Sequence, residues 1–246
     1  MAAEIQVFDN KADLFNNSAT KIVSIAKEFI QKSGQFNIAL SGGSTPKGVY
    51  TILSASLKDE IDWRKVHVFW SDERTVVSTH PDSNYRMAKE SLLDLSGIPQ
   101  INIHRVASEE DPMLAAQQYE DDIRDFFNVP DGVFPAFDLI LLGMGDDGHT
   151  ASLFPESEAL SVHDRLVVDN YVKKMNTHRI TFTFPLINHA RNVMFMVSGS
   201  SKSKMVKQVL ENTGAENPLP SQKVNPESGS LFWLLDKEAA ADLTRS

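Results

Sequence analysis

Polar side chains that can do chemistry gather in one segment, residues 143–152, which reads GMGDDGHTAS. The apolar run 139–142 just before it is typical of a buried strand, so the segment starts at a strand's carboxyl end. Gly143, Gly145 and Gly148 permit a tight turn and the close approach of a ligand to the backbone. His149 follows, and an imidazole is the side chain that ordinarily changes charge near neutral pH. We expect it to sit on a short helical turn over residues 150–154.

Two other interpretations of this segment stay open. Gly143, Gly145 and Gly148 match the G-x-G-x-x-G pattern of dinucleotide sites, and Asp169 is an acidic residue after the next strand-like run. Two features argue against a dinucleotide site. The negative charges of Asp146 and Asp147 would face the pyrophosphate, and Pro155 leaves room for only a very short helix. His149 would otherwise fill a hydrogen-bonding position in a loop.

Three further segments carry polar or charged residues where a predicted strand gives way to a loop. They are residues 41–45 (SGGST), 72–74 (DER) and 199–202 (GSSK). In an open α/β sheet the carboxyl ends of the strands meet at one edge, where ligands bind. We therefore expect these segments and the histidine segment to form one site.

Two of the segments lead into predicted helices and are candidate phosphate sites. Thr45 is predicted to be an N-cap and Pro46 the first helical residue, and a second helix begins near Lys202. Free amide groups and the helix dipole favour a phosphate at such positions. Lys202 adds a full charge where it does not help the helix. The alternatives are an ordinary tight turn at Gly42 and Gly43 and a solvated lysine.

Arginines supply the remaining candidate anion ligands. Arg74, at a strand end, presents a planar fork of donors that could hold an anionic group, although Asp72, Glu73 and Arg74 could equally form a structural ion-pair cluster. Arg179 lies on the polar face of a predicted strand and could bind an anion or face water. The six other histidines lack glycine-rich surroundings and are interpreted as structural, and no metal-ligand spacing is present.

Strands that alternate with helices must position these residues. Strands are predicted at 5–8, 36–40, 66–70, 101–105, 139–142, 166–169, 179–184, 193–197 and 231–235. Helices are predicted from Leu14 to Gly34, from 45 towards 53, near 85–93, after Pro112, after 202 and from Lys237, and residues 212–229 should be a loop. This pattern predicts a single α/β domain over residues 1–246, doubly wound, with a mainly parallel sheet and helices on both faces. Residues 166–184 are a possible small antiparallel addition.

Composition limits the class of protein. Of the 246 residues 41% are hydrophobic, enough for a sizeable core, and the net charge of -9 argues against a nucleic-acid partner. The absence of cysteine excludes thiol catalysis and thiolate ligands. The start, MAAEIQVF, is unlike a leader, and no run approaches membrane-spanning length, so we expect a soluble cytoplasmic protein with no membrane partner.

Six segments together resemble the 6-phosphogluconolactonase family, in the family's order. They are ALSGGSTP (39–46), SDERTV (71–76) with HPDSNYRM (80–87), LLGMGDDGHTASLFP (141–155), RITFTFPLIN (179–188), VSGSSKSKMVKQVL (197–210) and WLLDKEAA (233–240). The resemblance runs from about residue 5 to 241. It implies the fold shared with glucosamine-6-phosphate deaminase, a sugar-phosphate lactone as substrate, and its hydrolysis in the oxidative pentose phosphate pathway without a cofactor.

The resemblance also implies a role for each site residue. His149 would be the catalytic base, with Arg74 and Asp72 beside it in the pocket. The loop of Gly42, Gly43, Ser44 and Thr45, together with Lys202, would hold the phosphate, and Arg179 would help to bind the substrate. Asp146 departs from the family, which more often has proline there. The oligomeric state does not follow from the sequence, and a monomer is favoured.

Two other functions fit the sequence less well. The related aminosugar-phosphate deaminase/isomerases carry a glutamate five residues after the histidine, where this chain has Phe154, and tend to have an aromatic residue where Arg74 stands. A non-catalytic sugar-phosphate sensor should have lost the histidine, yet His149 is present. Both rivals are therefore disfavoured.

Overall fold

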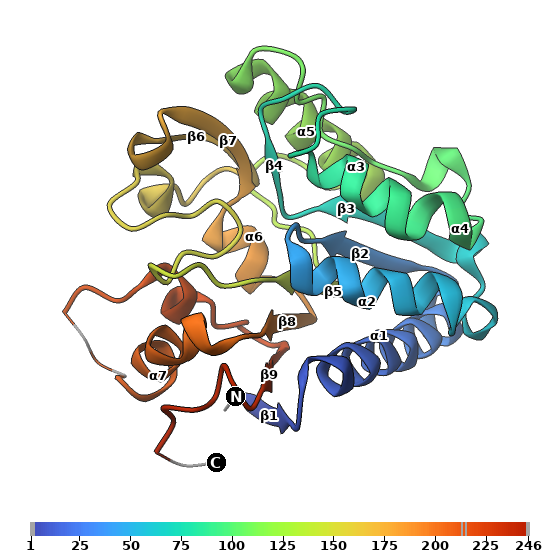
Figure 1. Cartoon of the computed structure of the whole chain (residues 1–246). Coiled ribbons are helices and arrows are strands. Elements are labelled where there is room, and N and C mark those ends of the chain that lie inside the picture. Colours follow the sequence, from blue (N-terminus) through green and yellow to red (C-terminus); the bar gives the residue numbers. More distant parts are fainter. Residues whose placement is uncertain (1–2, 213, 215, 245–246) are drawn as a thin grey trace.

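The computed structural model describes residues 3–212, 214 and 216–244. A six-stranded sheet forms its centre, in the order β1-β9-β8-β5-β2-β3, and all neighbouring strands in it are parallel (Figure 1). Most of the predicted strands are therefore confirmed. The six strands are β1 (Glu4–Phe8), β2 (Phe36–Leu40), β3 (Val66–Trp70), β5 (Leu139–Leu142), β8 (Asn192–Val197) and β9 (Ser230–Asp236).

A second, antiparallel sheet has three strands in the order β4-β7-β6, namely β4 (Asp72–Arg74), β7 (Thr177–Phe182) and β6 (Val167–Val172). The expected antiparallel addition is confirmed, but residues 72–74 are a strand of it rather than a loop. The chain changes sheets at Ser71, whose amide donates to Leu40 O at 2.9 Å while its carbonyl accepts from Phe182 N at 2.9 Å.

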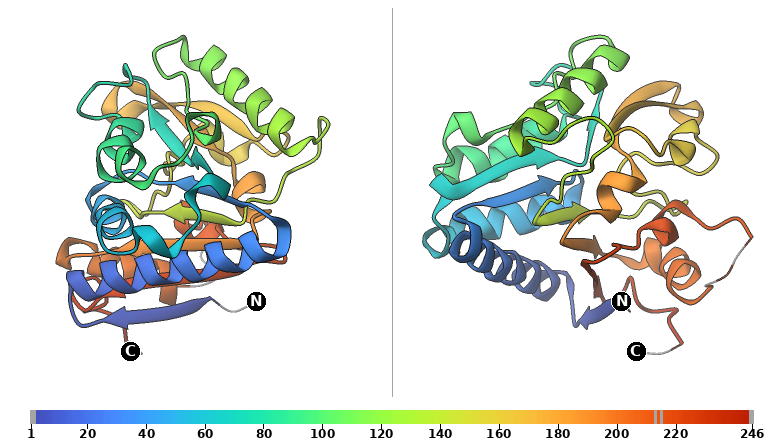
Figure 2. Two further views of the ribbon diagram at one scale, coloured as in Figure 1. Left: turned by 90° about the vertical axis from the view of Figure 1, so that its right-hand side faces the viewer. Right: turned by 180° about the vertical axis from the view of Figure 1, so that it is seen from behind.

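Helices cover both faces of the large sheet (Figure 2). Strand β5 shows the division, because Leu139 and Leu141 pack with α1 and α2 whereas Ile140 and Leu142 pack with α5, α6 and α7. This alternation is the one expected of a strand buried on both sides. The helices are α1 (Lys11–Ser33), α2 (Ser44–Ala55), α3 (Asn84–Ala88), the π-helical η3 (Lys89–Leu93), α4 (Asp94–Ser96), α5 (Pro112–Phe127), α6 (Phe184–Asn188) and α7 (Ser203–Glu211).

Several local predictions were wrong. Residues 101–105 are not a strand: the 3₁₀-helix η4 (Gln100–Asn102) is followed by a single bridge from Ile103 to Val68. From Lys237 the chain forms turns instead of a helix. The predicted loop 212–229 contains the 3₁₀-helix η8 (Pro220–Lys223), and its residues 213 and 215 lie outside the described residues. The other 3₁₀-helices are η1 (Lys58–Glu60), η2 (Trp63–Lys65), η5 (Glu158–Ser161), η6 (Lys173–Met175) and η7 (Ser200–Lys202).

The order of strands reverses between β2 and β5. From β2 the chain continues outward to β3, whereas β5, β8 and β9 follow one another on the other side. Ligands of open α/β sheets bind outside the carboxyl ends of the strands at such a reversal. The loops after β2 and β5 flank it, and the β6–β7 hairpin and α7 lie on the same side of the molecule (Figure 1).

Candidate active site

His149 is held by an aspartate two residues before it. Its Nδ1 lies 2.5 Å from Asp147 Oδ1, and its ring stacks on Phe154 with the centroids 4.1 Å apart. The expected helical turn is absent: residues 150–153 form a tight turn closed by a bridge from Thr150 to Leu153, with Ala151 at φ +46°. The imidazole is therefore positioned by side-chain contacts in a loop, and a quarter of it stays exposed.

The glycines of this loop have different roles. A Cβ on Gly145 would lie 2.0 Å from His149 Nδ1, so only glycine leaves room for the ring. Gly148 has φ +77°, a conformation that glycine adopts without strain. Gly143 needs neither property, because a Cβ there would meet no atom within 4 Å. The sequence pattern treated the three glycines as equivalent, whereas the structure requires glycine at 145 and 148.

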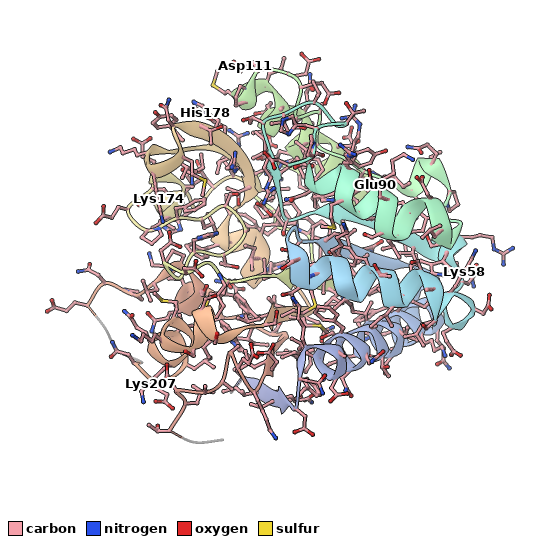
Figure 3. All side chains as sticks on the ribbon, viewed as in Figure 1. Lys58, Glu90, Asp111, Lys174, His178 and Lys207 are labelled. Carbon is pink, nitrogen blue, oxygen red and sulfur yellow. The ribbon has the colours of Figure 1, made fainter. Side chains whose placement is uncertain are left out.

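Asp147 fixes the chemistry of the imidazole. Partial burial raises the pKa of Asp147, but its hydrogen bonds with His149 and the positive charges of His149 and Lys174 outweigh burial and leave that pKa below its usual range. An ionised Asp147 accepts a hydrogen bond from Nδ1–H, so the Nε2 lone pair is free to act as a base. Lys174, labelled in Figure 3, lies on the β6–β7 hairpin. Its Nζ is 3.5 Å from Asp147 Oδ2. Sequence reasoning named Asp147 among the polar residues of the segment but gave it no role, although the D-x-H spacing was an available signal, and it did not single out Lys174.

One face of β4 and β7 carries the predicted charged residues. In their antiparallel register Asp72 pairs with Thr181 and Arg74 with Arg179, so these four side chains share a face of the small sheet. Burial and the charge of Arg74 lower the pKa of Arg179, while Asp72 acts in the opposite direction. The register therefore places two cationic side chains, Arg74 and Arg179, on one face of the small sheet of an acidic chain.

Asp72 is buried and joins this face to the histidine loop. Ser152 Oγ donates to Asp72 Oδ2 at 2.7 Å, and Asn84 Nδ2 donates to the Asp72 carbonyl at 2.9 Å. Ser152 N in turn donates to Thr181 Oγ1 at 3.1 Å. Asn84 also fills the space beside Gly42, where a Cβ would lie 1.9 Å from Asn84 Oδ1. These contacts make Asp72 a link between three segments. Ser152 belongs to the polar segment noted in the sequence but received no role there, and Asn84 was not predicted as a site residue.

The loop after β2 opens into α2. Gly43 takes φ +105° as the N-cap residue, and the first helical hydrogen bond runs from Lys47 N to Gly43 O at 3.1 Å. The prediction that Thr45 is the N-cap was wrong: Thr45 lies inside the first turn, and its hydroxyl bonds Ser198 Oγ at 2.8 Å. The helix thus starts at Ser44, and the amides of Ser44 and Thr45 belong to its first turn, where they have no intrahelical acceptor.

Lys202 completes a ring of contacts among the four predicted segments. Its Nζ lies 2.5 Å from Asp146 Oδ1 in the histidine loop. The contact between Thr45 and Ser198 joins the loop after β2 to the loop after β8. Asn84 lies beside Gly42 and bonds Asp72, which in turn bonds Ser152 of the histidine loop. These contacts therefore join the four segments that carry the predicted residues, and Arg74 and Arg179 share a face of the small sheet with Asp72. The predicted residues are Gly42, Gly43, Ser44, Thr45, Asp72, Arg74, His149, Arg179 and Lys202.

Together these segments combine one imidazole–carboxylate pair with several cations and free helix amides, a set suited to proton transfer on an anionic substrate. Residues 143–157 form turns and a bridge, so the glycine pattern lacks the helix that a dinucleotide site would need. Among the described residues no group of three or more histidine or acidic side chains is arranged to hold a metal ion. Within the same ranges, no helix is both long enough and apolar enough to cross a membrane.

Comparisons with known proteins agree on one family. Residues 9–233 match the family described as glucosamine-6-phosphate isomerases/6-phosphogluconolactonase. A 6-phosphogluconolactonase of Synechocystis sp. is 45% identical over 99% of both chains, and one of Nostoc sp. is 44% identical over 99% of this chain and 100% of its own. The solved structure of 6-phosphogluconolactonase from Trypanosoma cruzi is 32% identical, with a TM-score of 0.87 over 99% of this chain and 97% of that one.

Proposed function

This chain belongs to the family of glucosamine-6-phosphate isomerases and 6-phosphogluconolactonases, and we propose that it hydrolyses 6-phospho-D-glucono-1,5-lactone to 6-phospho-D-gluconate in the oxidative pentose phosphate pathway. One observation supports the assignment of residues: the loop that holds the His149–Asp147 pair contacts Lys202 through Asp146 and Asp72 through Ser152. No cofactor enters the reaction, because water and a reactive ester suffice.

His149 acts as the general base. With Nδ1 bonded to Asp147, Nε2 takes a proton from a water molecule as the water oxygen attacks the lactone carbonyl. The resulting imidazolium is stabilised by the Asp147 carboxylate. It then returns the proton to the ring oxygen as the carbon–oxygen bond of the tetrahedral intermediate breaks. The product is a carboxylic acid, which releases a proton to solvent, and His149 is regenerated.

Arg74 stabilises the oxyanion of the intermediate. It shares a face of the small sheet with Arg179, and its guanidinium is anchored by a hydrogen bond from NH1 to the Asp82 carbonyl at 2.6 Å. A fixed cation gains most in the transition state, where the carbonyl oxygen becomes charged. Arg179 binds substrate hydroxyl or anionic groups. Asp72 positions Ser152, whose hydroxyl donates to it, and its negative charge acts on Arg179.

The phosphate binds between Lys202 and the first turn of α2. The amides of Ser44 and Thr45 and the helix dipole attract an anion, and Gly42 and Gly43 let the backbone approach it. Holding the phosphate orients the distant carbonyl towards His149 and contributes to rate through positioning.

Phe154 argues against the isomerase alternative. Its ring is buried and stacks on His149, so the position offers no group that could move a proton during ring opening. We therefore expect no release of ammonia from glucosamine 6-phosphate.

The assay is proton release from freshly prepared lactone, after subtraction of spontaneous opening. We expect His149→Ala to lower kcat by about a hundredfold to ten-thousandfold with little change in KM. His163→Ala is a matched control, because His163 is exposed and lies outside the site. Equal rates for His149→Ala and the unchanged protein would refute the assignment.

We further propose that the protein works in the cytoplasm as a monomer. Gel filtration would test the oligomeric state.

A further inference from the structure

Lys202 already has an anionic partner. Asp146 Oδ1 lies 2.5 Å from Lys202 Nζ, and nearly three quarters of the Asp146 side chain is exposed while Lys202 is mostly covered. The two residues come from different segments, the loop after β5 and the start of α7. The next residue, Asp147, contacts His149 instead. Two consecutive carboxylates therefore serve different cations of the site.

The other acidic groups near α7 are engaged elsewhere. Asp242 accepts a hydrogen bond from Ser203 Oγ at 2.8 Å, and Glu211 accepts from Thr244 N and lies 3.6 Å from Lys207. The contact of Lys202 with Asp146 is thus a pairing across the site, rather than the local i,i+4 kind seen between Lys207 and Glu211.

We propose that Asp146 competes with the substrate's phosphate for Lys202 and thereby sets the affinity and anion selectivity of the phosphate subsite. The inference rests on the proposed function. A carboxylate oxygen and a phosphate oxygen use the same donors of an ammonium group. A phosphate dianion also gains the α2 amides, so it displaces Asp146 towards solvent. A weakly held monoanion cannot contact Lys202 and the α2 amides together, so it does not displace Asp146 from Lys202.

The effect is modest because exposed ion pairs are weak. Removing the carboxylate frees Lys202 and removes a negative charge beside the phosphate. We expect about a twofold to fivefold gain in phosphate affinity, the range that a single exposed pair supplies. The gain should appear in KM, because the phosphate lies away from the reacting carbonyl and Asp146 touches neither His149 nor Arg74 in the described contacts.

Asp146→Asn is the test, with Glu28→Gln as the matched control. Glu28 lies exposed on α1 and its substitution changes the net charge by the same amount. The measurements are KM and kcat for the lactone, and the inhibition constant of inorganic phosphate. We expect both KM and the inhibition constant to fall about twofold to fivefold in Asp146→Asn, with kcat and the melting temperature unchanged. In Glu28→Gln, KM, kcat and the inhibition constant should equal those of the unchanged protein.

Coupling to Lys202 separates this role from a structural one. In a Lys202→Met background, Asp146→Asn should no longer improve phosphate binding. The inference is overturned if Asp146→Asn matches Glu28→Gln, if it weakens phosphate binding, or if its effect persists without Lys202. Failure of the proposed function gives another result, because the unchanged protein would then show no lactone hydrolysis. Calorimetric titration with inorganic phosphate would still decide the role of Asp146.

Discussion

Gly145→Ala displaces the proposed base without removing it. The backbone at residue 145 lies outside the left-handed region, so alanine is sterically allowed by the main chain. Its Cβ, however, would lie 2.0 Å from His149 Nδ1 and 2.1 Å from Cε1. To restore an ordinary contact of 3.4 Å the ring must move by about 1.4 Å, and the stacked Phe154 limits where it can go. The bond to Asp147 is then lost.

A displacement of about 1 Å at a catalytic group costs on the order of a hundredfold in rate. We therefore expect kcat for the lactone to fall by about a hundredfold in Gly145→Ala, measured by proton release at saturating substrate. Binding of inorganic phosphate should change little, since the proposed phosphate contacts are made by Lys202 and the first turn of α2. The melting temperature should also change little, because the imidazole is partly exposed.

Gly143→Ala is the matched control in the same loop. A Cβ there meets no atom within 4 Å, and Gly143 has no positive φ, so the enzyme should keep its rate. The reasoning is refuted if Gly145→Ala retains a kcat within about threefold of the unchanged protein, or if both variants lose activity equally.

Two further predictions concern the sheet that holds the site. Burial raises the pKa of Tyr50, whose protonated hydroxyl donates to Ser41 O at 2.9 Å and accepts from Ser41 N at 3.0 Å. Tyr50→Phe leaves the buried amide and carbonyl of Ser41 without this partner, so we expect the free energy of unfolding in urea to fall by about 1–3 kcal/mol and KM to rise. An unchanged unfolding midpoint would contradict this. Burial also raises the pKa of Asp138 to about 6, against a hydrogen bond from Asn37 N and the nearby charge of Arg191. Because the folded state then binds more protons between about pH 4 and 6, Asp138 costs stability as pH rises through that window. Asp138→Asn should remove this cost, so its stability relative to the unchanged protein should rise by up to about 2 kcal/mol from pH 4 to pH 7; a difference independent of pH would count against it.

Local sequence patterns predicted the buried strands well. Strands β2, β3 and β5 have the expected bounds, since short apolar runs ending in glycine or serine have few other conformations in a chain of this composition. Gly34 ends α1 as predicted because its φ of +83° favours glycine. The doubly wound class followed from the alternation of these elements.

Contacts between distant segments could not be predicted in the same way. Thr45 has the composition of an N-cap, yet its hydroxyl bonds Ser198, which is 153 residues away in the chain. Ser152 and Asp72 are 80 residues apart, and no local period signals their hydrogen bond. Tertiary pairing likewise drew residues 72–74 into a second sheet, where a loop was expected.

The site shows the same division. Strand ends and glycines indicated which segments meet, because parallel strands place their carboxyl ends at one edge. The partner of each side chain depended on details of loop conformation, as for Asp146 with Lys202 and Asp147 with His149. Neighbouring aspartates of identical type thus received different partners.

A crystal structure with 6-phosphogluconate bound would test the central claim most directly. We predict the phosphate within hydrogen-bonding distance, about 3 Å, of Lys202 Nζ and the Ser44 and Thr45 amides, with Asp146 turned away. The C1 carboxylate should lie at a similar distance from His149 Nε2 and Arg74. A sugar phosphate bound at another surface, or bound here with C1 directed away from His149, would contradict the account.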